Sequence, residues 1–134
     1  MPLEVRVQPE VCTDGPKGTD LEIDVSKPDD GDAFAPGEKI GIKLDVKNNG
    51  DNNLGTVVEA FLYNIDQDDE IERVESDVVE IRKDGKSEEF NLELTIPTED
   101  IDEDDEYILY IKAYEDGEED NNCAEDSLGI DIKR

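Results

Sequence analysis

The residues of this sequence whose types and spacing could do chemistry are acidic side chains that gather in short clusters. Ca²⁺ is bound by carboxylate and carbonyl oxygens, and alternate Asp spacing places several carboxylates on one side of a loop. None of the clusters has the Gly and Glu positions of an EF-hand loop, and a solvated acidic surface is the competing interpretation. We expect acidic loops at opposite ends of the sandwich to compete for Ca²⁺, with the second or the third cluster as its site. The three clusters are Asp29, Asp30 and Asp32; Asp66, Asp68, Asp69 and Glu70; and Asp100, Asp102, Glu103, Asp104 and Asp105.

Other kinds of reactive site find no support in the sequence. The chain has no histidine, so none of its serines has the general base that a Ser-His-Asp triad needs. The loop carboxylates lack the burial or the partner that would separate their pKa values for acid–base work. The glycines Gly15 and Gly18 are not followed by the Lys-Ser/Thr ending of a phosphate-binding loop. We therefore expect no catalytic residues, no certain cofactor beyond the candidate Ca²⁺, and no enzymatic activity.

The net charge limits which classes of molecule the chain can bind. The chain of 134 residues has 40 Asp and Glu against 13 Lys and Arg, a formal net charge of -27. This excess repels nucleic-acid phosphate and anionic lipid, attracts cations and favours solubility at high salt. No apolar run approaches the ~20 residues of a membrane-spanning helix. We expect no nucleic-acid partner and no direct membrane insertion.

The elements that must position these side chains are β-strands. Leu, Ile, Val and Phe make up about a quarter of the chain, which is above the ~20% level below which highly charged chains stay unfolded. Apolar and charged residues alternate with period two, as in strands with one buried and one solvated face. The pattern predicts strands at 21–25, 40–46, 56–65, 77–82, 90–96, 106–115 and 127–133, and a shorter one at 3–7.

The separators between these strands carry turn residues, such as Pro36-Gly37, Asp84-Gly85 and Asp116-Gly117. About seven or eight short strands with such turns predict an all-β, immunoglobulin-like antiparallel sandwich, with a closed barrel as the alternative. Segments 57–65 and 107–114 have apolar residues on both parities, which indicates central strands. Tyr107, two residues after Asp105 at a strand start, resembles the tyrosine corner of immunoglobulin-like sandwiches.

The chain resembles the CARDB-type, cell-adhesion-related domain. The resemblance covers about residues 21–133, and it rests on PGEKIGIKLDVKNNGDNN, the strand VVEAFLY, the segment DGKSEEFNLEL and the final DEYILYIKAYEDGEEDNN. It implies an immunoglobulin-like sandwich that serves as a non-catalytic module of secreted or surface proteins, often as one unit of a multidomain string. The chain departs from the family pattern in its two cysteines and its extra N-terminal strand.

An even cysteine count in a domain that resembles a surface module implies a disulfide between Cys12 and Cys123. The bridge would join an N-terminal strand and linker, residues 1–20, to a sandwich formed by residues 21–134. Two reduced thiols in a cytosolic protein are the alternative. We do not expect a zinc site, because two thiolates without histidine do not complete its ligand shell.

Two further surfaces are candidates for contact with other proteins. If Ala60 and Leu62 face the core, an apolar strip faces outward and could bind a partner; its residues are Phe61, Tyr63, Tyr110 and Tyr114. The alternative is that Leu3, Val5 and Val7, or the opposite sheet, cover this strip. Segments 3–7 and 128–132 are alternating strands that could pair with another chain if they lie at sheet edges.

Together these features predict a highly acidic, salt-adapted structural or adhesion module that is extracellular or on a cell surface and is not an enzyme. Its expected partners are neighbouring domains or a protein at the cell surface, together with cations. One alternative is a Ca²⁺-dependent domain that recognises protein or carbohydrate. Another is a subunit of a surface filament that is linked through edge strands.

Overall fold

The computed structural model describes residues 12, 18, 20–99, 101–102, 104–118 and 122–133. Within these residues all the regular secondary structure is β-strand, and no helix is long and apolar enough to cross a membrane. The strands follow the chain as β1 (Leu21–Lys27), β2 (Asp32–Phe34), β3 (Lys39–Asn48), β4 (Leu54–Asn64), β5 (Asp69–Glu75), β6 (Val79–Ile81), β7 (Lys86–Thr95), β8 (Tyr107–Glu115) and β9 (Cys123–Ile132).

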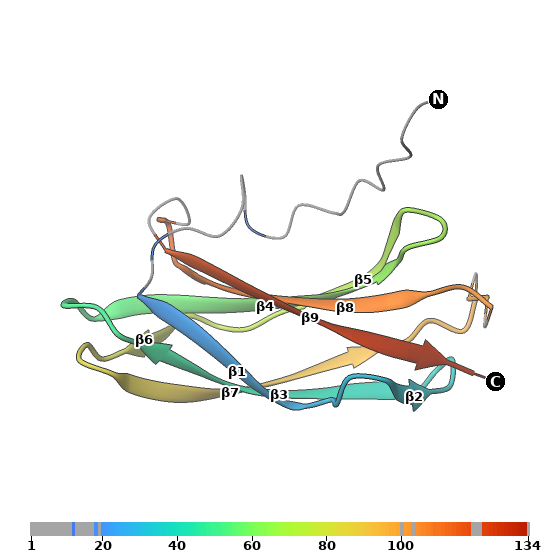
Figure 1. Cartoon of the computed structure of the whole chain (residues 1–134), viewed down its shortest axis with the longest axis horizontal. Helices are drawn as coiled ribbons and strands as arrows, with labels where there is room; N and C mark the ends of the chain where they lie inside the picture. Colours follow the sequence, from blue (N-terminus) through green and yellow to red (C-terminus); the bar gives the residue numbers. More distant parts are fainter. Residues whose placement is uncertain are drawn as a thin grey trace.

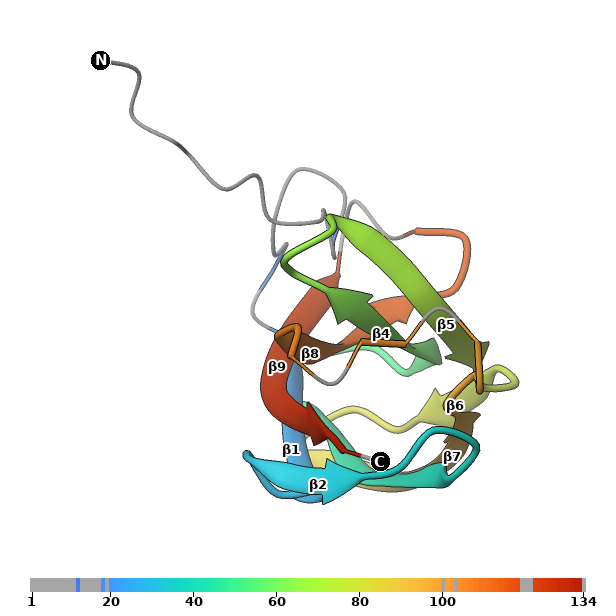
Figure 2. The same ribbon diagram turned by 90° about the vertical axis from the view of Figure 1, so that its right-hand side faces the viewer.

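These strands form two sheets that pack face to face (Figures 1 and 2). The smaller sheet has the order β1-β3-β7, and the larger has the order β2-β9-β8-β4-β5, with β6 also paired to β4. Every pairing is antiparallel except that of β2 with β9, which is parallel. The fold is therefore the all-β, immunoglobulin-like sandwich that the sequence predicts.

The alternation of β3 shows how the sequence builds the core. Ile40, Ile42, Leu44 and Val46 are buried, whereas the residues between them are exposed or half-buried. Removing one such aliphatic side chain from water contributes about 1.5–3 kcal/mol. The inner face of the larger sheet completes the core with Val58, Ala60, Leu62, Leu109, Ile111 and Ala113.

Strands β4 and β8 lie in the middle of the larger sheet and are buried on both faces. All of β4 except Gly55 is buried, and five consecutive residues of β8, from Leu109 to Ala113, are buried as well. This confirms the central position that their apolar residues on both parities predict. A second apolar cluster, separate from the main core, lies on the outer face of these strands.

Three features of the sheets differ from the sequence prediction. The pattern misses β2 and β5, because β2 has three residues and β5, with the sequence DEIERVE, is mostly charged. Strand β9 begins at Cys123, several residues before the predicted 127. Its end is paired with β8 on one side and with β2 on the other, so segment 128–132 is not an open edge. The predicted strand 3–7 lies outside the described residues.

Candidate functional site

The two candidate Ca²⁺ loops lie at the same end of the sandwich, and not at opposite ends. Asn64, at the end of β4, is the antiparallel partner of Tyr107, at the start of β8. The β4–β5 turn therefore meets the β7–β8 loop. The backbone N–H of Ile65 donates to the carbonyl oxygen of Glu106 at 2.9 Å and joins the two.

Several carboxylates of these loops accept hydrogen bonds from the protein itself. Asp105 accepts at Oδ2 from the side-chain amides of Asn64 and Gln67, both at 2.8 Å. Asp66 accepts at Oδ2 from the backbone N–H of Glu106, and Asp68 accepts from the Tyr63 hydroxyl at 3.4 Å. The bonds of Asp66 and Asp105 join the two loops and brace the junction between them.

The remaining members of the acidic clusters are dispersed. Asp69 and Glu70 belong to β5, and Glu70 pairs with Arg73 of the same strand. Asp104 donates its backbone N–H to Asp102, whereas Asp100 and Glu103 lie outside the described residues. Among the residues that the structure describes, no group of three or more acidic side chains is arranged to hold a metal ion. Ca²⁺ binding stays a prediction.

Tyr107 is buried at the same end of the sandwich. Its side chain is 1% exposed, and its hydroxyl donates to the carbonyl oxygen of Asp102 at 2.9 Å and accepts from the N–H of Asp102 at 3.0 Å. A buried tyrosine that bonds to the backbone a few residues upstream is the arrangement of a tyrosine corner. Burial is the largest cause that raises the pKa of this hydroxyl above its ordinary value.

Cys12 and Cys123 form a disulfide, with their Cα atoms 6.0 Å apart. Both residues are buried. Cys123 opens β9 opposite Tyr114 of β8, and the backbone N–H of Cys12 donates to Glu125 Oε2 at 3.1 Å. The bridge therefore attaches the chain before the sandwich to the larger sheet.

Three of the four aromatic residues of the candidate partner face form one cluster on the outer side of the larger sheet. The ring of Phe61 stacks on that of Tyr110 with centroids 5.3 Å apart, and Tyr63 meets Tyr110 edge to face at 6.2 Å. Their exposed fractions are between 2% and 9%. Lys112 Nζ lies 4.9 Å from the centroid of the fourth ring, that of Tyr114. A partner at this face stays a prediction.

Charged side chains beside this cluster form ion pairs with one another. Glu59 and Lys112 are each 8% exposed, and they are cross-strand partners with 3.6 Å between Lys112 Nζ and Glu59 Oε2. Arg73 reaches Glu59 at 2.7 Å and lies over the ring of Phe61 at 4.6 Å. Hydrogen bonds to Glu70 and then to Glu59 raise the pKa of the Arg73 guanidinium, although burial acts in the opposite direction.

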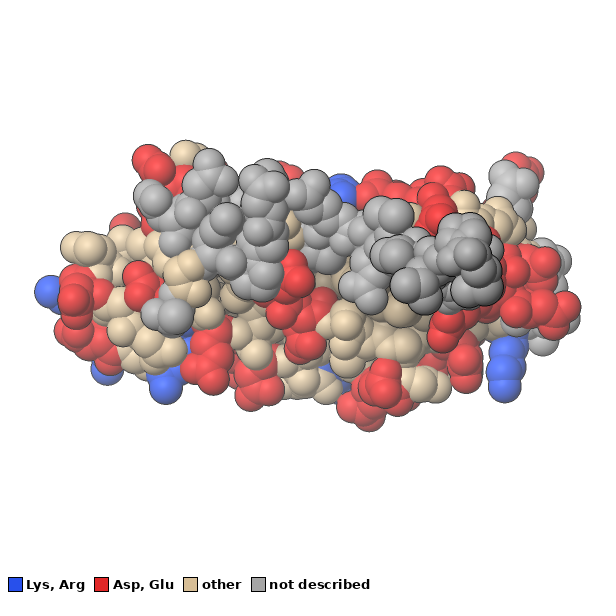
Figure 3. All heavy atoms as spheres, turned by 45° about the horizontal axis from the view of Figure 1, so that its top comes forward, with Lys and Arg blue, Asp and Glu red and all other residues tan. Residues whose placement is uncertain are grey.

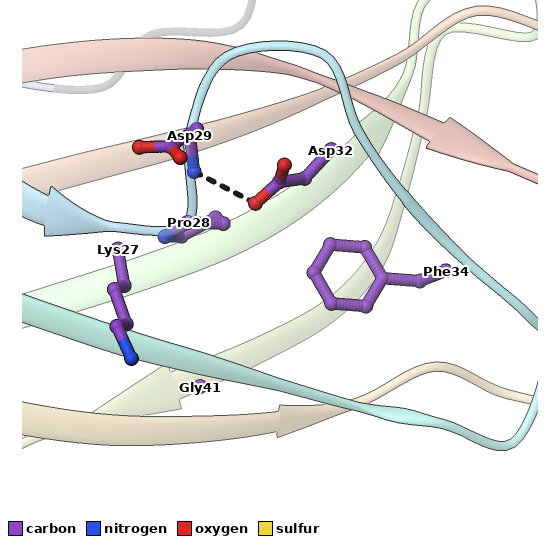
Figure 4. Close-up of a pocket in the computed structure, with 6 residues that line it drawn as sticks. All are labelled: Lys27, Pro28, Asp29, Asp32, Phe34 and Gly41. Carbon is purple, nitrogen blue, oxygen red and sulfur yellow. Dashed lines mark hydrogen bonds between the residues drawn. The ribbon is translucent and has the colours of Figure 1, made fainter.

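A cavity that the sequence analysis missed lies where the chain passes from β1 to β2 (Figure 4). Its volume is about 400 Å³, and Lys27, Pro28, Asp29, Asp32, Phe34 and Gly41 line it. The Phe34 ring extends into it from one side, and on the other side the Lys27 side chain runs toward the level of Gly41. A signal for it exists in the sequence, because Gly41 interrupts the outward row of charged side chains along β3.

The acidic residues of the surface do not single out one site. Figure 3 shows Asp and Glu side chains spread along the full length of the visible face. This distribution fits the competing interpretation of a solvated acidic surface. The charge alone therefore does not distinguish one loop from another.

No protein-family model matches the sequence, and no curated protein matches it. Solved structures do match in three dimensions. The crystal structure of the sporulation control protein Spo0M from Bacillus subtilis matches over 85% of this chain and 49% of that chain, with 18% identity and a TM-score of 0.53. The alkylpurine DNA glycosylase AlkC of Pseudomonas fluorescens matches over 87% of this chain and 31% of its own, with 10% identity and a TM-score of 0.56. This chain thus spans about half of the first and a third of the second.

The solution structure of the CARDB domain of PF1109 from Pyrococcus furiosus matches over nearly its whole length. The alignment covers 85% of this chain and 96% of that domain, with 18% identity and a TM-score of 0.50. At such identities the likeness shows the fold. This chain therefore has a CARDB-like, immunoglobulin-like sandwich fold, as the sequence resemblance implies.

Proposed function

We propose that this chain is a non-enzymatic structural or adhesive module of an extracellular or cell-surface protein. The observation that carries the proposal is the disulfide between Cys12 and Cys123. Disulfides persist in oxidising surroundings outside the cell and are rare in the cytosol of mesophiles. Together with a CARDB-like sandwich, the bridge favours an extracellular location.

The mechanism of such a module is rigidity combined with surface contact. Two packed sheets hold the connecting loops in a fixed geometry, and the hydrogen bonds of Asp66 and Asp105 brace one end of the sandwich. A net charge of -27 opposes aggregation, and the hydrated cations that it attracts support solubility at high salt. The acidic composition thus suits a module that works in salt-rich surroundings.

The comparison structures support the idea of a module within a longer chain. The same fold occupies 49% of the Spo0M structure and 31% of AlkC, so it occurs there as one part of a larger protein. A domain in such a position presents its faces and loops to its neighbours. We therefore propose neighbouring domains or a surface protein as the partners of this chain.

The redox state of the native protein tests this proposal. Protein isolated from its natural source without reductant is treated with a thiol-alkylating reagent under denaturing conditions and weighed by mass spectrometry. We expect no alkylation before reduction and two adducts after it, the second sample being the control. Two alkylated thiols before reduction would overturn the extracellular assignment and favour the cytosolic alternative.

A further inference from the structure

We propose that the cavity between the β1–β2 connection and β3 binds one sugar unit of a neutral glycan. The cavity holds about 400 Å³, which lies within the range of ~300–1,000 Å³ common for small-molecule sites. The inference gives the adhesive role proposed above a specific ligand class and rests on that role. It concerns a part of the molecule that contains neither cysteine.

Gly41 is the first feature that points to a ligand. It is an exposed position near the start of β3, and glycine within a strand weakens it and often marks a close approach by a ligand or another backbone. Its φ is not positive, so the backbone does not require glycine there. A Cβ atom at this position would meet nothing within 4 Å. No packing neighbour therefore explains the missing side chain.

The irregularity near the end of β1 is the second feature. Residues Leu21, Ile23 and Val25 pair with Asn48, Val46 and Leu44 on the inner side of β3. The register then shifts between Val25 and Lys27, so that Lys27 pairs with Lys43, an exposed position of β3. Strand bulges re-aim side chains and are common beside functional sites. Here the shift moves an ammonium group to the outer face, beside the cavity (Figure 4).

The wall that faces Lys27 is held in place by the neighbouring strand. The backbone N–H of Gly31 donates to the carbonyl oxygen of Gly129 at 2.8 Å, and Asp30 accepts from the N–H of Gly129 at 2.6 Å. Asp32 accepts from the N–H of Asp29 at 2.9 Å, and Phe34 is paired with Ile132. These contacts fix the walls in the absence of a ligand, which lowers the entropic cost of binding.

The groups around the cavity match a sugar ring with hydroxyls. Lys27 offers only hydrogen-bond donors, whereas the carboxylate of Asp32 offers only acceptors, and a hydroxyl can satisfy both. The half-buried ring of Phe34 provides an apolar surface for the C–H face of the sugar. Lys27 forms no ion pair with any residue in the described ranges, so its ammonium is available.

Other ligand classes fit less well. The net charge of -27 repels an anionic glycan or a phosphate ester. A metal ion would lie beside the Lys27 ammonium with only two carboxylates to bind it, and a purely apolar ligand would desolvate charged groups without replacing their hydrogen bonds. A neutral sugar carries no charge to be repelled, and its hydroxyls can replace the hydrogen bonds of the charged groups.

Nuclear magnetic resonance titration of the ¹⁵N-labelled protein tests the proposal. The probes are maltopentaose, cellopentaose and mannopentaose, in buffer with fixed salt. We expect at least one of them to cause saturable shifts that centre on the amides of Gly41, Lys27 and Phe34. The absence of saturable shifts with all three sugars, or shifts centred elsewhere, would overturn the proposal. A lysine-rich peptide that shifts the same amides in place of the sugars would overturn it in favour of a peptide site.

Two variants and a matched control sharpen the test. Gly41→Leu fills the cavity, and we expect affinity to fall by about tenfold or more while stability is unchanged or higher. Lys27→Gln removes the ammonium without changing the fold and should weaken binding severalfold. Asn91→Leu, at an exposed position of β7 opposite Lys43, should bind like the wild type. Gly41→Leu with wild-type affinity would overturn the proposal, whereas the thiol measurement above tests the extracellular role separately.

Discussion

The inner faces of the two sheets are both apolar, but their outer faces differ in how far their side chains are buried. On the outer face of the larger sheet, Phe61 and Tyr110 are 2% and 6% exposed, and even the charged Glu59 and Lys112 are buried. On the outer face of the smaller sheet, the ion pairs Lys39–Glu93 and Lys43–Glu89 have side chains that are 46–64% exposed. The larger sheet thus has apolar packing on both sides, and the smaller sheet on one.

This difference distinguishes the sheet on which stability depends most from the face that tolerates substitution. Burial of aromatic side chains and of a charged network on both sides makes the larger sheet sensitive to substitution. The solvated face of the smaller sheet tolerates substitution, and the proposed glycan cavity lies beside it. The comparison predicts that matched substitutions on the two faces have unequal effects on stability.

Removal of the disulfide has the largest expected effect on the larger sheet. In the chain-entropy model, a bridge with a sequence separation of 111 contributes up to about 4–5 kcal/mol, because it restricts the unfolded chain. The double variant Cys12→Ser, Cys123→Ser should therefore lose about 2–5 kcal/mol in urea unfolding. Reduced wild-type protein is the control and should match the variant. A loss below about 1 kcal/mol would show that the bridge does not stabilise this sheet.

Phe61→Ala is expected to have an effect of similar size. The variant removes a ring that stacks on Tyr110 and lies under Arg73, and truncation of a buried phenylalanine costs about 3–5 kcal/mol. Asn91→Ala, an exposed position of β7, should change the free energy of unfolding by no more than about 0.5 kcal/mol. Equal losses for the two variants would contradict the distinction between the outer faces.

The variants Arg73→Met and Lys39→Met compare the charged groups on the outer faces of the two sheets. Methionine keeps the apolar stem but leaves the buried Glu59 with Lys112 as its cationic neighbour, and an imperfectly paired buried carboxylate costs about 1–3 kcal/mol. Lys39→Met removes an exposed pair with Glu93 and should cost no more than about 0.5 kcal/mol. Urea unfolding of both variants measures the difference. A larger loss for Lys39→Met would reverse the interpretation.

The buried tyrosines make the free energy of unfolding sensitive to high pH. Burial is the largest cause that raises the pKa values of Tyr63, Tyr107 and Tyr110 above the ordinary 10.0. Because the unfolded chain releases these protons at lower pH than the folded one, the free energy of unfolding should fall as pH rises above about 10. Ultraviolet titration should show tyrosinate appearing later in the folded protein than in urea. Identical titration curves would mean that the rings are solvated.

The sequence predicts the sandwich well because most of its strands carry a local signal. Alternation locates β1, β3 and β7, and apolar residues on both parities identify β4 and β8 as central. The Asp105-x-Tyr107 pattern predicts a tyrosine corner, and the buried Tyr107 hydroxyl bonds to Asp102. In these elements, local sequence and final burial agree.

The parts that escape prediction depend on which strands pair. No local pattern shows that β4 ends beside the start of β8, so the two acidic loops are expected at opposite ends although Asn64 lies opposite Tyr107. Strand β5 has little apolar pattern of its own and forms along β4, where Arg73 meets Phe61. The cavity likewise lies beside a register shift near Lys27, which only the paired strands reveal.

The smallest expected effect concerns the end loops and divalent cations. The carboxylates of Asp66 and Asp105 already accept hydrogen bonds from backbone and amide N–H groups, so a cation would compete with these bonds. We expect Ca²⁺ and Mg²⁺, at fixed monovalent salt, to raise the unfolding temperature slightly, equally and without saturation, because both screen a net charge of -27.

Specific binding would give a different titration. A ligand at a hundredfold excess over its Kd stabilises the folded state by about 2.7 kcal/mol, which in a domain of this size is a rise of several degrees. A saturable rise of that size with Ca²⁺ but not Mg²⁺ would show a metal site at the loop end. Loss of that rise in Asp105→Asn, with Asp45→Asn on the smaller sheet as the control, would assign it to the braced junction. The end loops, and not the outer faces, would then be the binding region of the module.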